Sequence, residues 1–176
     1  MEQLVMRWKK TALPDAPDWT GYVFRCFDGS DEDIEAWLDI VQYGLTEKRE
    51  DKAFFRQCMY SHGNLEYDKF FMVECGGVPA ATLAVICDYE KKQGYIHMVA
   101  CKPEFRGRGI GTRLNTEAVR ALVSSGMETA YLTTDDFRIP AIKSYLKAGF
   151  VPDIKDEEHK KRWEKVFDTI NKDKAL

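Results

Sequence analysis

The sequence predicts a mixed α/β domain with a central, mostly antiparallel sheet flanked by helices. Between residues 70 and 102, β-rich runs follow one another without a helix, which is typical of a strand meander. Further along, helical periodicity alternates with single strand-like runs. A chain of 176 residues, 44% of them hydrophobic, is long enough for one well-buried domain and short for two. We therefore expect a single domain over residues 20–176, preceded by an irregular lead-in at 1–19.

The first part of this domain is predicted to hold one strand and two helices. Residues 20–29 (TGYVFRCFDG) have a β-rich composition and end in a turn dipeptide. Ser30 and Asp33 then form an S-x-x-D helix opening, after which apolar residues recur at helical spacing. A second helix is expected at about 50–60, ended by SHGN at 61–64. We expect its aromatic residues in the core; the wall of an acceptor pocket is the other interpretation.

Three strand-like runs come next. KFFMVECGG and VPAATLAVICDYE meet at Gly76-Gly77, a dipeptide suited to the positive φ angles of a tight hairpin turn. The third run, GYIHMVACK at 94–102, ends before Pro103, which has no N–H to donate to a strand ladder. The remaining chain alternates helices and strands. We predict a helix from residue 110 to about 124, a buried strand at 129–134, a helix at 139–149, a short strand at 150–154 and a charged C-terminal helix at 156–171.

Composition excludes several classes of function. A net charge of −3, from 26 basic and 29 acidic side chains, gives no basic field for nucleic acid. The five cysteines include no CxxC pair and the chain has three histidines, so neither a disulfide framework nor a metal site is indicated. The N-terminus lacks the apolar core of a signal peptide, and no run approaches the roughly 20 residues of a membrane span. We expect a cytoplasmic protein without membrane or nucleic-acid partners.

The stretch CKPEFRGRGIGTRL, residues 101–114, joins the third strand of the meander to a helix. Backbone N–H groups and the positive end of the helix dipole converge at such a junction, which suits phosphate binding. Three alternate glycines allow close backbone approach and three arginines add charge, so this interpretation is favoured over an exposed basic turn. The stretch lacks the G-K-[ST] of a P-loop, and its glycine spacing differs from G-x-G-x-x-G. An NAD-dependent oxidoreductase would therefore rest on glycine content alone.

Residues 106–111 (RGRGIG) resemble the acyl-CoA signature [RQ]-x-x-G-x-[GA] of the GNAT superfamily of N-acetyltransferases. A second stretch, PAIKSYLKAGF at 140–150, resembles the family's helix that carries a tyrosine and ends in G-F. With the preceding strands, the resemblance covers about residues 70–150. The chain departs from the pattern at Arg138, where many members carry Asn, and after Phe150, where one short strand and a helix replace a final strand pair. The resemblance implies a GNAT-like fold with an added C-terminal helix, and acetyl-CoA as cosubstrate.

The resemblance also implies which residues contact acetyl-CoA. In the family, the pantetheine pairs with the backbone of the strand before the loop, and the pyrophosphate sits on the loop. The pantetheine residues would be Val99, Ala100 and Cys101; the pyrophosphate residues would be Arg106, Gly107, Arg108, Gly109, Ile110, Gly111 and Thr112; and Arg138 would belong to the local CoA contacts.

For catalysis, the resemblance makes Tyr145 the proton donor to the departing CoA thiolate, the alternative being a helix tyrosine that packs its ring. His97 is the preferred base, because serotonin-type members carry a histidine at the matching place and a pKa near 6.5 suits proton removal. A packed strand histidine is the alternative. Asp135, Glu104 and a water relay stay open as bases. Cys101 is not favoured as a nucleophile, since direct transfer requires no covalent intermediate.

These expectations describe an N-acetyltransferase in which a primary amine attacks acetyl-CoA directly in a ternary complex. The alternative is a non-catalytic GNAT-fold sensor that binds acyl-CoA. The sequence leaves the acceptor open between small-molecule and peptide amines, and it also leaves open whether the protein forms a homodimer.

Overall fold

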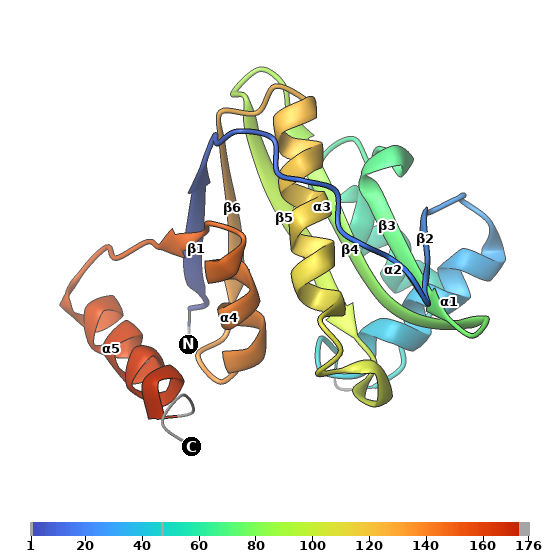
Figure 1. The fold of residues 1–176 in the computed structure, drawn as a ribbon. Coiled ribbons are helices and arrows are strands. Elements are labelled where there is room, and N and C mark those ends of the chain that lie inside the picture. Colours follow the sequence, from blue (N-terminus) through green and yellow to red (C-terminus); the bar gives the residue numbers. More distant parts are fainter. Residues whose placement is uncertain (1, 47, 173–176) are drawn as a thin grey trace.

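The computed structural model describes residues 2–46 and 48–172, and it confirms the predicted mixed α/β class. Helices cover both faces of a single seven-stranded sheet (Figure 1). The limits predicted for the lead-in and the domain, residues 1 and 176, lie outside the described residues. In chain order the elements are β1 (Leu4–Lys9), β2 (Val23–Cys26), α1 (Asp31–Val41), α2 (Lys52–Tyr60), the short 3-10 turn η1 (Tyr67–Lys69), β3 (Phe70–Cys75), β4 (Val78–Asp88), β5 (Gln93–Cys101), the turn η2 (Pro103–Phe105), α3 (Ile110–Ser124), β6 (Thr129–Thr134), α4 (Ile139–Lys147), β7 (Val151–Pro152) and α5 (Glu157–Lys172).

The strands lie in the order β2-β3-β4-β5-β6-β1-β7. The predicted meander is present as β3, β4 and β5, each antiparallel to the next. β5 and β6 are parallel, and the other neighbouring pairs are antiparallel. The sheet is therefore mixed but mostly antiparallel, as predicted. Its one parallel junction lies between the strand that precedes the glycine-rich loop and the strand that follows α3.

The prediction of an irregular lead-in is wrong for Leu4–Lys9, which form strand β1 between β6 and β7. Leu4, Met6 and Trp8 are buried, while Arg7 and Lys9 are exposed. This alternation has the period of two that a strand requires. The signal is only six residues long, and the prolines that follow it belong to residues 10–19, which form neither helix nor strand.

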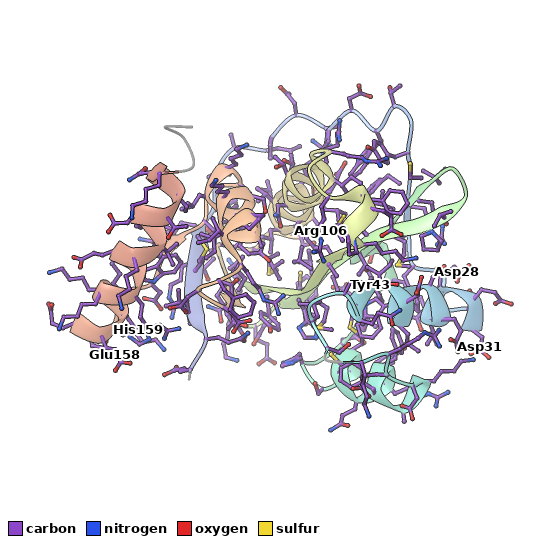
Figure 2. The ribbon with its side chains drawn as sticks, turned by 90° about the horizontal axis from the view of Figure 1, so that it is seen from below. Asp28, Asp31, Tyr43, Arg106, Glu158 and His159 are labelled. Carbon is purple, nitrogen blue, oxygen red and sulfur yellow. The ribbon has the colours of Figure 1, made fainter. Side chains whose placement is uncertain are left out.

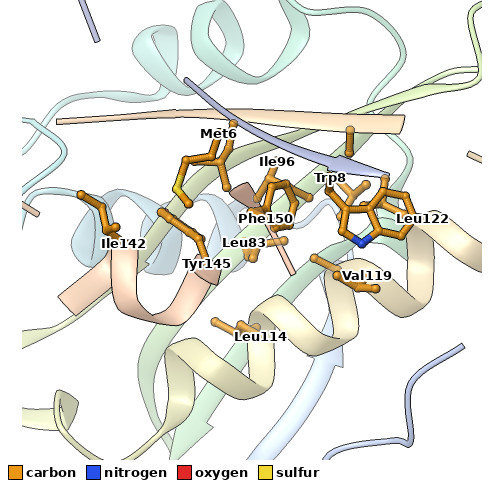
Figure 3. Packing of buried hydrophobic residues seen from close by; sticks show 14 of the residues in the cluster. Met6, Trp8, Leu83, Ile96, Leu114, Val119, Leu122, Ile142, Tyr145 and Phe150 are labelled. Carbon is orange, nitrogen blue, oxygen red and sulfur yellow. The ribbon is translucent and has the colours of Figure 1, made fainter. Parts of the chain in front are cut away.

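The helices divide between two hydrophobic cores. One core lies between the sheet and α3, α4 and α5, and it contains Trp8, Leu83, Leu122 and Phe150 (Figure 3). The other lies between the opposite face of the sheet and α1 and α2. α5, the outermost helix, packs on α4 (Figure 1). Within the described ranges, no helix has the length and apolar character needed to cross a bilayer.

Local sequence accounts for where these helices begin and how closely they pack. The Ser30 hydroxyl accepts from the Asp33 N–H at 3.1 Å, so the predicted cap of α1 is confirmed. Gly94 lets α3 approach β5, because a Cβ at this position would lie 2.0 Å from Cδ2 of Leu122. This contact joins the start of β5 to the C-terminal part of α3.

Candidate active site

A gap in the sheet separates the C-terminal halves of β5 and β6. The two strands pair only from Gln93–Thr129 to Tyr95–Tyr131. Beyond this point lies a pocket of about 210 Å³. Side chains from both faces of the sheet and from α4 reach it; its lining residues are Gln3, Leu45, Tyr95, Ile96, His97, Met98, Val99, Thr133, Thr134, Arg138, Ala141 and Tyr145.

A β-bulge in β5 lies beside this gap. His97 pairs with Ala84 of β4, but Ala100 pairs with Thr82, so β5 holds one residue more than β4 between the two pairs. Met98, within the bulge, has a φ of 53°, which a side chain with a Cβ rarely adopts. The bulge changes the direction of β5 where it parts from β6.

Downstream of the bulge, β5 presents alternate backbone groups to the gap. The Lys102 N–H donates to the Ala80 carbonyl at 2.9 Å, and Ala100 pairs with Thr82. Because backbone groups of successive strand residues point in opposite directions, those of Val99 and Cys101 point away from β4. The backbone groups of these two residues face the gap, and their contacts with pantetheine stay a prediction. Ala100 does not fit that prediction, since its backbone is directed at β4 and its side chain is buried in the α1 and α2 core.

The loop before α3 presents a run of backbone donors. Gly107 and Gly109 have φ angles of 75° and 77°, which only glycine adopts without strain. Gly109 is the N-cap of α3, and the first helical hydrogen bond after it is Arg113 N–H to Gly109 carbonyl. Within the described part of the chain, the N–H groups of residues 107–112 donate to no other protein group. Unpaired N–H groups at a helix N-terminus suit an anion, and phosphate binding here stays a prediction.

The arginines of this loop hold its backbone together. Arg106 donates from Nε to the Cys101 carbonyl at 2.9 Å and from Nη2 to the Tyr43 carbonyl at 2.6 Å (Figure 2). Arg108 donates to the Glu104 carbonyl at 2.8 Å, and Arg113 to the Arg108 carbonyl at 2.9 Å. Arg106 therefore uses two of its nitrogens in structural contacts, while Arg108 and Arg113 each use one and keep further donors beside the backbone N–H groups.

The remaining predicted loop residues differ in their surroundings. The Ile110 side chain is 1% exposed and belongs to the core, so only its backbone faces the loop. Gly111 has no left-handed φ, but a Cβ there would point toward Oγ of Ser144 on α4 at 3.9 Å. Thr112 is half-buried, and its carbonyl accepts from Thr116. At these three positions, the sequence motif indicates backbone groups that could bind a ligand more than side chains that could do so.

Tyr145, on α4, lines the pocket from the α3 and α4 face of the sheet. Its ring is buried beside Ile142 and Phe150 (Figure 3). Burial raises the pKa of its hydroxyl, and the nearby Arg138 charge opposes that rise. The hydroxyl therefore keeps its proton at neutral pH. The packing alternative and the proton-donor prediction for Tyr145 are compatible with one another.

His97 lines the same pocket from the α1 and α2 face. Its Nε2 lies 3.3 Å from the Cys58 carbonyl, which can only accept, so Nε2 carries the hydrogen in the neutral ring. Nδ1 then accepts from the Tyr95 hydroxyl at 3.2 Å. Burial, with a smaller contribution from His62, lowers the pKa of His97 to about 4. The expectation of a pKa near 6.5 is wrong, because the ring is desolvated.

The other candidates for proton transfer lie off the wall of the pocket. Asp135 accepts from Arg138 Nε at 2.8 Å and from Gln3 at 3.2 Å. Glu104 belongs to η2, beside the glycine loop. Burial raises the pKa of the Cys101 thiol to about 11, so it stays protonated and is a poor nucleophile. Within the described residues, no group of three or more His, Cys, Asp or Glu side chains is arranged to hold a metal ion.

A second hollow, of about 500 Å³, lies on the outer side of α1. It is open, and three of its four carboxylates already have cationic partners: Asp31 pairs with Lys52, Glu35 with Arg49 and Asp39 with Lys102. Its described lining residues include no histidine, tyrosine or cysteine. The smaller pocket between β5 and β6 is the better candidate for chemistry.

Sequence reasoning missed several residues of this pocket. Tyr95 could have been predicted from the sequence, because it lies two residues before His97 and a strand places such residues on the same face. Its ring stacks on Tyr131, with centroids 4.8 Å apart. Nothing in the sequence indicated Gln3 or Thr134, since Gln3 lies just before a strand that was not predicted and Thr134 ends an ordinary β-run.

Comparison with known proteins places most of the chain in one family. Residues 32–150 match the acetyltransferase (GNAT) family. An uncharacterized N-acetyltransferase of Methanocaldococcus jannaschii is 28% identical over 142 residues, which are 78% of this chain and 59% of that protein. The matched part therefore spans little more than half the length of that relative.

Solved structures share the fold. The GCN5-related N-acetyltransferase from Sphaerobacter thermophilus matches 87% of this chain and 50% of its own, with a TM-score of 0.70 and 20% identity. The NatC complex bound to Gag peptide and CoA matches 74% of this chain and 84% of its own, with a TM-score of 0.61 and 18% identity. At these identities the likeness establishes the fold.

Proposed function

This chain belongs to the acetyltransferase (GNAT) family, and from that membership we propose that it transfers an acetyl group from acetyl-CoA to a primary amine by direct attack in a ternary complex. The observation that carries the proposal is the pocket between β5 and β6, which Tyr145 lines from one face of the sheet and His97 from the other. Direct attack needs two substrates that meet in one place with proton-handling groups beside them.

We propose that acetyl-CoA enters from the α3 and α4 face. The unpaired N–H groups of residues 107–112 would receive the pyrophosphate, with the helix dipole favouring its negative charge. The outward backbone groups of Val99 and Cys101 would pair with pantetheine. Arg106 already donates to the Cys101 carbonyl, so its role is to hold the end of β5 against the loop. The thioester would then lie in the pocket beside Tyr145.

Proton transfer would use the two faces differently. An acceptor amine with a pKa near that of lysine, about 10.4, is protonated at pH 7 and must lose a proton before it attacks. With a pKa of about 4, His97 is neutral at pH 7 but binds a proton weakly. We therefore assign proton removal to a water relay that the Tyr95 hydroxyl, itself held by neutral His97, orients, and proton delivery to Tyr145. The rate of acetyl transfer should then rise with pH as the acceptor amine loses its proton. The pH–rate profile should show no step near pH 6.5, where an ordinary histidine titrates.

The acceptor would approach from the α1 and α2 face, where aromatic rings surround the pocket. The ring centroids of His62 and Tyr95 lie 5.1 Å apart, and those of His62 and His97 lie 4.7 Å apart. These rings suit the apolar part of an amine, whether a small molecule or a peptide. The NatC complex, which shares the fold, was solved with both a peptide and CoA, and this supports including peptides among the acceptors tested.

The proposal is tested by CoA release from acetyl-CoA across a panel of small amines and peptides. We expect at least one acceptor to release CoA well above the rate without acceptor. If acetyl-CoA binds tightly but no acceptor releases CoA, the non-catalytic acyl-CoA sensor takes the place of the enzyme. The comparisons do not favour that alternative, because the relatives are N-acetyltransferases by name.

A further inference from the structure

Arg138 brings a positive charge to the wall of the pocket. Apart from His97, it is the only side chain among the described lining residues that can carry a positive charge. Arg138 is the N-cap residue of α4, and its Nε donates to Asp135 at 2.8 Å. Its guanidinium carbon lies 5.6 Å from the centroid of the Phe137 ring. These contacts fix the side chain at the pocket.

The ion pair with Asp135 leaves part of the guanidinium available. Asp135 engages Nε, and neither Nη nitrogen donates to a protein group within the described residues. An arginine offers five N–H donors, so a second acceptor can bind without breaking the first contact. The available donors lie where the pocket meets α4, whereas the backbone donors of the glycine loop lie at the N-terminus of α3.

Thr134 supplies a second, independent observation. It ends β6 and lines the pocket, yet it is 2% exposed, and its hydroxyl has no hydrogen-bond partner among the described residues. A buried hydroxyl without a partner is costly, so such groups in proteins usually meet a ligand or an ordered water. Thr134, Arg138 and Tyr145 thus bring three donors to one pocket.

Beyond the proposed function, on which this step rests, we propose that Arg138 and Thr134, together with Tyr145, form the binding site for the sulfur that leaves as CoA thiolate. As the amine nitrogen bonds to the acetyl carbon, the C–S bond breaks and the sulfur keeps the electron pair. The amine gives one proton to water. Arg138 stabilises the thiolate, which then receives a proton through the Tyr145 hydroxyl: this hydroxyl donates to the sulfur while it takes a proton from water, so no free phenolate forms.

Charge distribution around the pocket favours this role over an anionic site for the acceptor. Arg138 and Tyr145 reach the pocket from the α4 side, while the other titratable lining residues, Tyr95 and His97, face α1 and α2. Arg138 also acts on Tyr145 directly, because its charge opposes the burial that raises the pKa of that hydroxyl. Asp135 offsets part of the charge without occupying the Nη donors.

The experiment measures the titration of the CoA thiol when it is bound to the full chain. Thiolate absorbance is followed against pH for the CoA complex, and the complex with desulfo-CoA, which lacks the sulfur, serves as the reference that cancels the protein's own tyrosines. The variants are Arg138→Gln, the charge-preserving Arg138→Lys, and Thr134→Val. Arg7→Gln is the matched control, because Arg7 is exposed and pairs with Asp153 away from the pocket. Circular dichroism and thermal unfolding establish that each variant is folded.

We expect the bound thiol to titrate at least about one pH unit below free CoA in the parent, the smallest shift expected of an opposite charge at contact distance. Arg138→Gln should abolish this shift, Thr134→Val should reduce it, and Arg138→Lys and Arg7→Gln should retain most of it. The affinity for desulfo-CoA should stay unchanged in all four variants.

A thiol that titrates alike in parent and Arg138→Gln overturns this inference and leaves acetyl transfer in place. Equal loss of affinity for CoA and desulfo-CoA in Arg138→Gln also overturns it, because Arg138 would then bind another part of the cosubstrate. If the folded parent binds neither compound, the proposed function itself fails. If a variant does not fold, Arg138→Lys and Thr134→Val against Arg7→Gln still decide the question.

Discussion

Acid should destabilise the parent protein more than a variant in which His97 is replaced by glutamine. The imidazole is buried between β5 and α2, with Nε2 on the Cys58 carbonyl and Nδ1 on Tyr95. Burial first, and then the neighbouring His62, lower its pKa in the folded state to about 4. In the unfolded chain a histidine titrates at about 6.5. Glutamine keeps an amide donor for the Cys58 carbonyl but has no proton to bind.

The sign of the effect follows from proton binding. As pH falls below 6.5, the unfolded state takes up a proton at this position and the folded state does not, so unfolding becomes more favourable. The contribution of His97 is therefore fully present above the unfolded pKa and is lost as pH falls toward 4. The difference between the unfolded and folded pKa values of His97 lowers the free energy of unfolding by about 2 kcal/mol between pH 7 and 5, and by about 3 kcal/mol between pH 7 and 4.

Urea unfolding of the two proteins at pH 7, 5 and 4 measures this loss. The difference between parent and His97→Gln is the quantity of interest, because carboxylates that also lose stability in acid contribute equally to both. His62→Gln is the matched control: it removes the neighbouring ring and should leave most of the His97 effect in place. Parallel pH dependences of parent and His97→Gln would refute the argument that this ring is neutral because it is desolvated.

Three further predictions concern the cosubstrate, the acid and the packing. Acetyl-CoA at one hundred times its Kd should raise the free energy of unfolding by about 2.7 kcal/mol, with no comparable effect of NAD. Gly109→Val should abolish this increase. Gly76→Val, which introduces the same kind of backbone strain in a distant hairpin, should retain it. Tyr145→Phe should lower kcat by roughly 10²-fold with little change in acetyl-CoA affinity. Tyr89→Phe, at an exposed tyrosine whose hydroxyl donates to Glu66, should leave kcat unchanged; equal turnover in both variants would leave water as the proton donor. Gly94→Ala should destabilise the fold by about 1–3 kcal/mol in urea unfolding, because its Cβ would meet a core leucine of α3 at 2.0 Å; an unchanged midpoint would show that this side chain moves freely.

Most of the fold could be predicted from local sequence. The cap at Ser30, the Gly76-Gly77 turn and the change from strand to helical period at Ile110 each depend on nearby residues, and the structure has an element boundary close to each. β1 was missed because its alternation is short and its partners, β6 and β7, lie more than a hundred residues away. Pairing over that separation leaves little trace in the strand itself.

The candidate site divides in the same way. The backbone donors at Gly107 and Gly109 could be predicted, because glycine is the residue that adopts a positive φ without strain. The role of Arg106 could not, since its acceptor, the Tyr43 carbonyl, belongs to a distant loop (Figure 2). Nor could the low pKa of His97, which depends on the atoms that replace water around the ring.

The bulge at Met98 explains why the site lies where it does. A regular β5 would continue its parallel ladder with β6, and its backbone groups beyond Tyr95 would be paired and closed to a ligand. The extra residue bends β5 away, at the cost of a positive φ at Met98, a strain of order 1–3 kcal/mol that persists only where surrounding structure holds it. Gly94, packed under α3, anchors the strand on one side of the bulge, and Arg106 anchors its end on the other. Between these two anchors, the unpaired edge of β5 can bind a substrate that reaches Tyr145 from one face and His97 from the other.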